Sequence, residues 1–183
     1  MIRVQPPQCF ATARLRLRPI CATDAGRVFR YAADAEATRF MIFQRHGALA
    51  ESEAFARRCE TCWRDGSAFP WAISLAATEE FVGGIELRIN SPKADFGYIL
   101  CRDYWGRGLA TEAASHVVRW ALAQPQIFRV WATCHPANLA SARVLEKSGL
   151  TYEGRLARWE PRPNLGEDAG DSLVYAATRA RGD

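Results

Sequence analysis

The sequence lacks the long apolar runs that a membrane-spanning protein needs. No uninterrupted apolar stretch approaches the ~20 residues required to cross a bilayer as a helix. The first ten residues, MIRVQPPQCF, also lack the apolar core of a secretory signal. We therefore expect a cytoplasmic protein with no membrane partner, in which the six cysteines are free thiols.

Patterns that bind metal or nucleic acid are scarce as well. Cys59 and Cys62 form a lone CxxC pair, whereas a zinc ribbon needs a second pair. Together with Phe55 and Trp63 they recur at helical spacing, so we interpret them as core residues and predict no metal site. The net charge of +4 comes almost wholly from arginine and is scattered along the chain. The absence of a basic stripe with interleaved aromatics argues against direct nucleic-acid binding.

The composition that remains is typical of one ordinary globular domain. The apolar fraction is 49% and the charged fraction is 24%. A chain of 183 residues can bury a core without disulfides or metal. No internal repeat and no inter-domain linker is evident, so we expect residues 1–183 to form a single domain.

The most informative segment, GYILCRDYWGRGLATEA, covers residues 97–113. It predicts a buried strand, a tight glycine-rich turn and the first turn of a helix. Such a helix start leaves several backbone N–H groups without internal partners, and its dipole favours negative charge. Gly106 and Gly108 carry no Cβ, so a ligand can approach the main chain, and Arg107 adds a positive charge. We predict a phosphate or pyrophosphate site here, with a ligand-free tight connection as the alternative.

The other elements follow from hydrophobic periodicity and turn residues. The patterns predict strands over 14–18, 69–76, 81–89, 94–101, 127–134, 151–159 and 172–178, and helices over 24–32, 52–66, 109–122 and 138–147. A proline, Pro19, ends the first strand. The expected helix caps are Thr23 or Asp24 for the first helix, Ser52 for the second and Asn138 for the last. This order predicts an α+β fold with a mixed sheet of about seven strands, about four helices and one parallel crossover.

Two motifs in this order resemble the GNAT acetyltransferase superfamily, in particular its RimJ/RimL-type branch. They are the segment 97–113 and PANLASARVLEKSGLTYEG at 136–154. The weaker segments TARLRLRPI and DSLVYA, near the two ends, extend the resemblance over nearly the whole chain. The resemblance implies that the parallel strands, here 95–101 and 127–134, splay apart. The pantetheine arm of acetyl-CoA, the co-substrate, then fills the gap like a missing strand.

The resemblance also implies which residues hold acetyl-CoA. The pyrophosphate would lie on the turn, which contains Trp105, Gly106, Arg107, Gly108, Leu109 and Ala110. Leu100 ends the splayed strand, and Asn138 would both cap its helix and contact the pantetheine amides. Trp105 stands where the family usually has Gln or Arg. This departure removes one side-chain donor and places more demand on the backbone amides and on Arg107.

Three residues are implied to carry the chemistry. Ser141 would lie near the thioester sulfur, unless it only hydrogen-bonds backbone in its helix. Many other family members use a Tyr further along this helix, but none occurs between Asn138 and Gly149. Asp95, where many members keep a Glu, and Glu86 on the preceding strand are the candidate general bases, directly or through water. For each carboxylate, the alternative is a solvated strand residue.

These features favour an N-acetyltransferase that moves an acetyl group to a primary amine by direct attack in a ternary complex. The branch suggests a protein N-terminal α-amine, as on a ribosomal protein, and dimers are common in it. Polyamine or drug acetylation and a non-catalytic acyl-CoA sensor on the same fold are the alternatives. A dinucleotide-dependent oxidoreductase is disfavoured, because the next strand ends in Ala-Thr-Cys-His without an acid. The acceptor pocket would be built from two variable loops, residues 37–50 and 160–170.

Overall fold

The structure, a computed structural model, describes residues 4–179. Eight strands form one sheet in the order β1-β2-β3-β4-β5-β6-β8-β7. The strands are β1 (Phe10–Ala11), β2 (Leu15–Pro19), β3 (Phe69–Leu75), β4 (Phe81–Asn90), β5 (Lys93–Leu100), β6 (Arg129–Cys134), β7 (Thr151–Arg162) and β8 (Glu167–Thr178). β5 and β6 are parallel, and all other neighbouring pairs are antiparallel.

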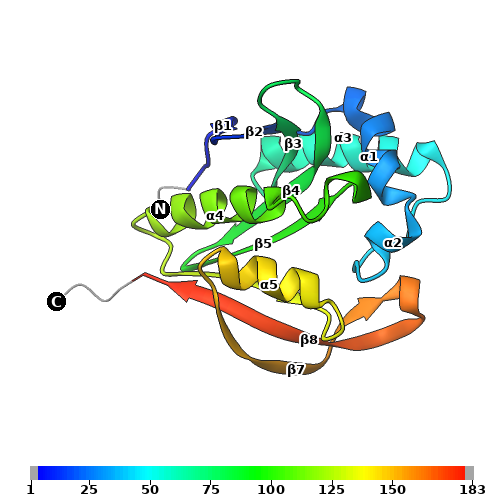
Figure 1. Cartoon of the computed structure of the whole chain (residues 1–183). Helices are drawn as coiled ribbons and strands as arrows, with labels where there is room; N and C mark the ends of the chain where they lie inside the picture. Colours follow the sequence, from blue (N-terminus) through cyan, green and yellow to red (C-terminus); the bar gives the residue numbers. More distant parts are fainter. Residues whose placement is uncertain (1–3, 180–183) are drawn as a thin grey trace.

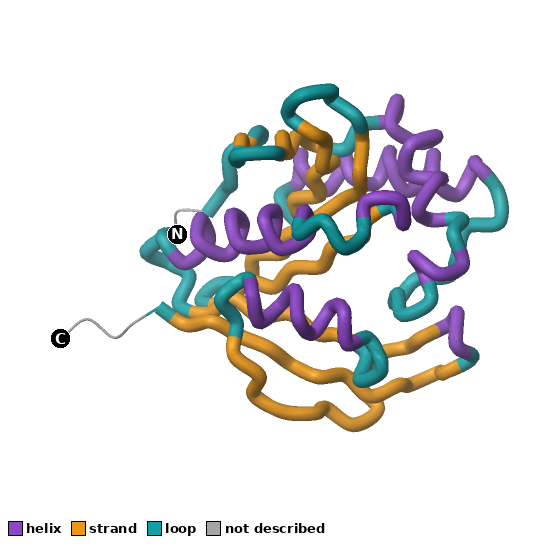
Figure 2. Tube along the Cα trace, in the orientation of Figure 1, coloured by secondary structure: helices purple, strands orange, loops and turns teal. Residues whose placement is uncertain are grey.

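Helices cover both faces of this sheet. They are α1 (Ala25–Ala32), α2 (Ala35–Thr38), α3 (Leu49–Asp65), α4 (Leu109–Leu122) and α5 (Leu139–Lys147), with 3-10 turns η1 (Ala22–Asp24), η2 (Arg102–Tyr104) and η3 (Pro163–Leu165). α4 and α5 lie on one face, and α1 and α3 lie on the other (Figure 1, Figure 2). The largest fully buried apolar side chains include Leu15, Leu17, Trp71, Ile73 and Leu87. Within residues 4–179, no helix combines the length and the apolar character needed to span a membrane.

The mixed α+β architecture and the parallel crossover predicted from the sequence are confirmed. α4 has the predicted bounds Leu109–Leu122, and Gly149 follows α5 with a left-handed φ of +92°. The sheet has eight strands instead of about seven, because the two-residue β1 adds an edge strand beside β2. The fifth helix, α2, is a single turn capped by Asp34, too short to produce a periodic pattern.

The predicted start of the second helix, 52–66, is wrong. α3 begins at Leu49, and the Glu51 carboxylate accepts hydrogen bonds from the N–H groups of Gly47 (2.6 Å) and Ala48 (2.9 Å). Ser52 therefore lies inside the helix. Its side chain is fully buried, and its hydroxyl is 2.7 Å from Nδ1 of His46. A carboxylate that reaches back to two free amides satisfies this helix end better than a serine one turn later.

The segment 160–170, which we expected to be a loop, belongs mostly to two long strands. β7 continues to Arg162 and β8 starts at Glu167, so only η3 and Gly166 connect them. Register shifts between Leu156 and Glu160 and between Glu160 and Arg162 interrupt the pairing. Such bulges break the strict alternation of polar and apolar residues on which strand prediction depends.

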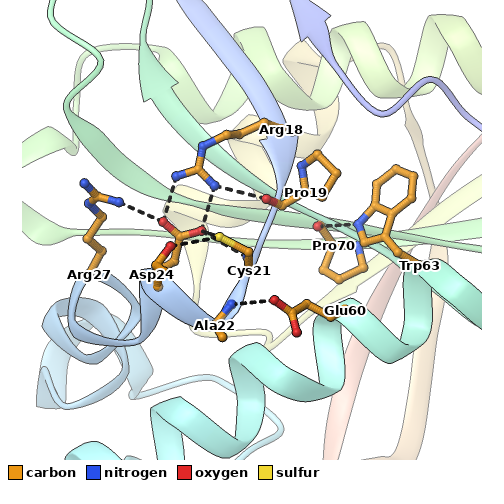
Figure 3. Close-up of polar contacts among 10 residues, drawn as sticks. Arg18, Pro19, Cys21, Ala22, Asp24, Arg27, Glu60, Trp63 and Pro70 are labelled. Carbon is orange, nitrogen blue, oxygen red and sulfur yellow. Dashed lines mark hydrogen bonds and ion pairs between the residues drawn. The ribbon is translucent and has the colours of Figure 1, made fainter.

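A buried carboxylate fixes α1 to the edge of the sheet. Asp24 is fully buried and accepts hydrogen bonds from Arg18 on β2 (both 2.7 Å), Arg27 on α1 (2.9 Å) and the Cys21 N–H (3.1 Å), as Figure 3 shows. It occupies the cap position of α1 but makes no side-chain bond to the amides of that helix. Its predicted role as a cap is therefore replaced by a buried ion-pair network.

The lone CxxC pair lies on α3. Cys59 is buried, Cys62 is half-buried, and the six cysteines are all free thiols. Burial raises the pKa of the Cys59 thiol, so this side chain is a poor nucleophile and behaves as a small core residue. Across the described residues, no cluster of three or more His, Cys, Asp or Glu side chains is arranged to hold a metal ion.

Candidate active site

The two central strands diverge soon after they meet. β5 and β6 are paired only from Lys93 to Asp95 on one strand and from Arg129 to Trp131 on the other. The Cys101 N–H donates to β4 at 2.9 Å. The N–H and C=O groups of successive strand residues point alternately to one neighbouring strand and to the other. Since those of Cys101 point to β4, those of Tyr98 point to the side from which β6 has moved away. The gap therefore offers unpaired strand backbone, which fits an extended pantetheine arm.

At the open end of this gap, the start of α4 presents unused amides. Within the described residues, the backbone N–H groups from Gly106 to Thr111 donate no hydrogen bond. The first helical bond runs from the Glu112 N–H to the Gly108 carbonyl (3.1 Å). Gly106 and Gly108 adopt left-handed φ values of +74° and +72°. The N–H groups of Leu109 and Ala110, at the first two positions of α4, belong to this set. Such a row of free amides at a helix start fits a pyrophosphate.

Trp105 and Arg107 differ from the expectation in detail. The Trp105 N–H donates to the Arg102 carbonyl at 3.0 Å, so it is not available to a ligand. The Trp105 indole N–H donates to the Leu100 carbonyl (3.0 Å), which ties the turn to the end of β5. The Arg107 guanidinium lies over the Tyr104 ring, 5.3 Å from its centroid. We therefore assign the free backbone donors to residues 106–111 only.

A clamp from the start of the chain holds the turn in place. The Glu112 carboxylate accepts hydrogen bonds from Thr12 Oγ1 (2.6 Å), Arg14 N–H (2.8 Å) and Arg14 Nε (2.6 Å). Arg14 Nη1 also donates to the Arg107 carbonyl at 3.0 Å. Burial alone would raise the pKa of Glu112, but these hydrogen bonds lower it. Sequence reasoning missed this clamp because the two partners lie 98 residues apart.

Ser141 and Asn138 meet at the start of α5. Asn138 Oδ1 accepts a hydrogen bond from the Ser141 N–H at 3.1 Å, so the predicted cap is confirmed. The side chain of Ser141 makes a separate contact, because its hydroxyl accepts a hydrogen bond from the Tyr98 hydroxyl at 3.0 Å. Burial raises the pKa of Tyr98 to about 12. Tyr98 was not singled out from the sequence, because only the fold shows that this β5 side chain reaches α5.

The two predicted base carboxylates share one arginine. Arg88 on β4 donates from Nη1 to Glu86 (2.5 Å) and from Nε to Asp95 (2.7 Å), with a further short contact from Nη2 to Asp95. Asp95 is the last β5 residue that pairs with β6, so it lies at the closed end of the gap. Glu86 lies opposite Gly97, one step further along the open part.

A third carboxylate borders the gap. Glu160 on β7 accepts hydrogen bonds from Thr133 Oγ1 (3.1 and 3.0 Å), Ser172 Oγ (3.0 Å) and Arg162 Nη2 (2.9 Å). Thr133 belongs to the end of β6 that is not paired with β5. The Arg162 side chain is buried, and within the described range its Nε has no hydrogen-bond partner. Glu160 was missed because it lies in the stretch that we expected to be a loop.

Donors and carboxylates lie on opposite faces of the sheet. Asp95 and Tyr98 are three residues apart on β5, whose register with β4 is unbroken, so their side chains point to opposite sides. Thr133 lies two residues after Trp131, the β6 partner of Asp95, and therefore shares its face. The gap thus connects a face with the Tyr98–Ser141 hydroxyls to a face with three carboxylates.

The loops expected to form the acceptor pocket meet on the carboxylate face. Asn164 in η3 donates to the carbonyls of Thr38 (2.7 Å) and Phe43 (2.9 Å) and accepts from the Arg45 N–H (2.8 Å). The Phe40 ring stacks on His135, which follows β6, with 4.9 Å between the ring centroids.

His135 itself is held as a neutral ring. Its Nδ1 accepts from the Ala137 N–H at 3.1 Å. Burial lowers the pKa of His135 despite the nearby Glu167.

Comparison with known proteins agrees with this geometry. The family model of the acetyltransferase (GNAT) domain matches residues 14–151. The uncharacterized N-acetyltransferase p20 of Bacillus licheniformis is 26% identical over 152 residues, which cover 81% of this chain and 85% of p20.

Two solved structures share the fold. RimJ of Mycobacterium smegmatis, in complex with a CoA disulfide, has 25% identity and a TM-score of 0.77, over 90% of this chain and 81% of RimJ. RimL, a ribosomal L7/L12 α-N-protein acetyltransferase in complex with coenzyme A, has 20% identity and a TM-score of 0.79, over 92% of this chain and 96% of RimL. With the splayed strands and the free amides, these matches establish that the chain belongs to the GNAT acetyltransferase family and is an acetyl-CoA-dependent N-acetyltransferase.

Proposed function

We propose that this enzyme acetylates a primary amine at a protein N-terminus, as on a ribosomal protein, by direct attack within a ternary complex. The observation that supports direct attack is the gap through the sheet, with hydroxyl donors on one face and carboxylates on the other. An amine that enters from the carboxylate face and a sulfur that leaves toward Ser141 need no covalent enzyme intermediate. Acetyl-CoA, when bound, supplies the acetyl group as an activated thioester.

Each step then has a group of this chain beside it. The amine nitrogen bonds to the acetyl carbon, and the carbon–sulfur bond breaks with its electron pair on sulfur. A carboxylate on the acceptor face takes the amine proton, directly or through water. The Ser141 hydroxyl donates a hydrogen bond to the departing sulfur. The amides from Gly106 to Thr111 hold the diphosphate, and the Asn138 amide contacts the pantetheine arm.

Among the three carboxylates, Glu160 is the base that the contacts favour. All three carboxylates are paired with an arginine, Asp95 and Glu86 with Arg88 and Glu160 with Arg162, but Asp95 lies where the strands are still paired. Glu160 is bonded to Thr133 on the unpaired end of β6. The pairing of all three carboxylates with Arg88 or Arg162 is also the observation that favours a non-catalytic acyl-CoA sensor, in which no carboxylate would be free to accept a proton.

An α-amine is the acceptor that needs the least help from this site. A free α-amine titrates near pH ~8 and a lysine amine near ~10.4, so more of the α-amine is neutral at pH 7.5. RimL, which shares the fold, is named as an α-N-protein acetyltransferase. On the acceptor side, Asn164 joins η3 to the segment that contains Thr38 and Phe43.

Thiol release from acetyl-CoA tests this function. We expect the highest kcat/KM with peptides that carry a free N-terminal amine, and lower values with polyamines and aminoglycosides. Peptides with an acetylated N-terminus serve as the control for lysine acetylation. Calorimetric binding of acetyl-CoA without thiol release on any amine of the panel would instead identify the acyl-CoA sensor.

Asn164→Ala is expected to impair the acceptor side alone. It removes four hydrogen bonds between η3 and residues 38–45, three of them at 2.7–2.9 Å and each of these with a net contribution of about 1 kcal/mol, so the loop becomes less ordered. We expect the KM for the acceptor to rise by roughly tenfold or more, in line with about 1.4 kcal/mol per tenfold change.

The matched control is Asn90→Ala, at the exposed last residue of β4, which should leave the acceptor KM unchanged. In Asn164→Ala the Kd for acetyl-CoA should also match that of wild type. A loss of acetyl-CoA binding equal to the loss of acceptor binding would remove the loop pair from the acceptor pocket.

A further inference from the structure

One contact in the gap joins β5 to the start of α5. The Tyr98 hydroxyl lies 3.0 Å from Ser141 Oγ, so a side chain of β5 reaches across to the first turn of α5. Tyr98 lies beyond Asp95, on the part of β5 that does not pair with β6. The phenol therefore ends at the place where the proposed function requires the sulfur to leave.

We propose that Tyr98 is a positioning residue that fixes the Ser141 hydroxyl as a hydrogen-bond donor to the sulfur of the thioester. This inference rests on the proposed role of Ser141. It assigns to β5 the hydroxyl that is missing from α5, where no Tyr occurs between Asn138 and Gly149.

The hydrogen-bond inventory of Ser141 carries the argument. A serine hydroxyl has one hydrogen to donate and two lone pairs that accept. The Tyr98 O–H occupies an accepting position of Ser141 Oγ, and the Ser141 N–H is already bonded to Asn138. The Ser141 hydrogen is therefore left to point away from Tyr98, into the gap. A donor at its oxygen also polarises the serine O–H, which strengthens the bond to a developing thiolate.

Tyr98 acts through Ser141 and does not supply the proton itself. Burial raises the pKa of Tyr98 to about 12, whereas a thiol has a pKa of about 8.5. Transfer from this phenol to a thiolate would be unfavourable by roughly three powers of ten. Cys134 on β6, the other titratable group beside Tyr98, has a pKa raised to about 11 by burial. Both groups therefore remain protonated donors through the neutral range.

A double-mutant cycle tests the proposal with acetyl-CoA and the best peptide of the panel. Ser141→Ala is expected to lower kcat by about 100-fold, within the range for a positioned proton or hydrogen-bond donor. Tyr98→Phe should lower kcat by about tenfold, the loss of one hydrogen bond. The double variant should equal Ser141→Ala within about twofold, because coupled residues are not additive. KM and Kd for acetyl-CoA, and the melting temperature, should stay near wild type in Tyr98→Phe.

Binding of CoA itself gives a readout that needs no turnover. At pH 9 much of the CoA thiol is ionised, while Tyr98 and Cys134 are not. We expect calorimetry to find tighter CoA binding at pH 9 than at pH 7 in wild type, with this gain lost in Ser141→Ala and reduced in Tyr98→Phe. Tyr175→Phe is the matched control, because that buried β8 hydroxyl is directed to Glu146 on α5 and not to Ser141.

The outcomes separate the two proposals. If Ser141→Ala slows turnover but Tyr98→Phe behaves as wild type, the positioning role is wrong and the proposed role of Ser141 stands. If the two single losses multiply in the double variant, Tyr98 acts independently of Ser141 and the inference is overturned. If Ser141→Ala itself matches wild type in both assays, the proposed function loses its donor and the inference falls with it.

Discussion

Asp24→Ala is expected to lower the free energy of unfolding at pH 7 by roughly 2–3 kcal/mol, because it removes a buried charged acceptor while the arginines that it pairs with are partly exposed to solvent. The carboxylate is fully buried and is the common acceptor for Arg18, Arg27 and the Cys21 N–H (Figure 3). Its removal leaves two guanidinium groups without their partner at the junction of β2 and α1. Asp24→Asn keeps the volume but not the charge and should have a smaller effect.

The same network predicts how stability depends on pH. Burial alone would raise the pKa of Asp24, but bonds from Arg18, Cys21 and Arg27 lower it to about 2. An unfolded Asp titrates near ~3.9. The folded pKa is therefore depressed, so the contribution is complete above pH ~5 and is lost progressively as the pH falls toward ~1, by roughly 2–3 kcal/mol in total.

Urea unfolding of wild type, Asp24→Asn and Asp24→Ala between pH 2 and pH 7 measures both effects. The control is Glu153→Ala, which removes the carboxylate of the exposed Arg129–Glu153 pair and should change stability by less than about 1 kcal/mol. Equal stabilities of Asp24→Ala and Glu153→Ala at pH 7 would contradict the assignment. An unchanged loss of stability between pH 4 and pH 2 in Asp24→Asn would assign that loss to other groups.

The elements near the diphosphate could be predicted because their causes are local. Gly106, Gly108 and the helix pattern after them determine free amides within a few residues of chain. The cap at Asn138 depends on a contact only three residues away. Local sequence carries such information directly, since turn and cap geometry depends on neighbouring dihedral angles.

The side-chain contacts across the gap could not be predicted in this way. Tyr98 and Ser141 are 43 residues apart, and their contact depends on how far β5 leans from β6. The family resemblance suggested Asp95 as a base because many members keep a Glu there, but the register that puts Arg88 opposite it is a tertiary property. Glu160 was concealed by bulges that interrupt the alternation of β7.

Gly108→Val is expected to weaken acetyl-CoA binding by at least ~100-fold, equivalent to two hydrogen bonds to a charged phosphate at about 1.5 kcal/mol each. Gly108 has a φ of +72° and caps α4, and its neighbours from Gly106 to Thr111 carry the free amides. A branched side chain disfavours this φ by about 1–2 kcal/mol, so the turn shifts and the amides no longer converge. It also adds bulk where the diphosphate must approach the main chain.

Gly149→Val separates this effect from backbone strain. Gly149 also has a left-handed φ, +92°, and a Cβ there would meet no atom within 4 Å. Its substitution should lower stability by a similar amount and leave the Kd for acetyl-CoA unchanged, because Gly149 ends α5 far along the chain from the free amides. Isothermal calorimetry on both variants decides the matter. Wild-type affinity in a folded Gly108→Val would mean that the diphosphate is held elsewhere, since no donor set that depends on this turn could survive the substitution intact.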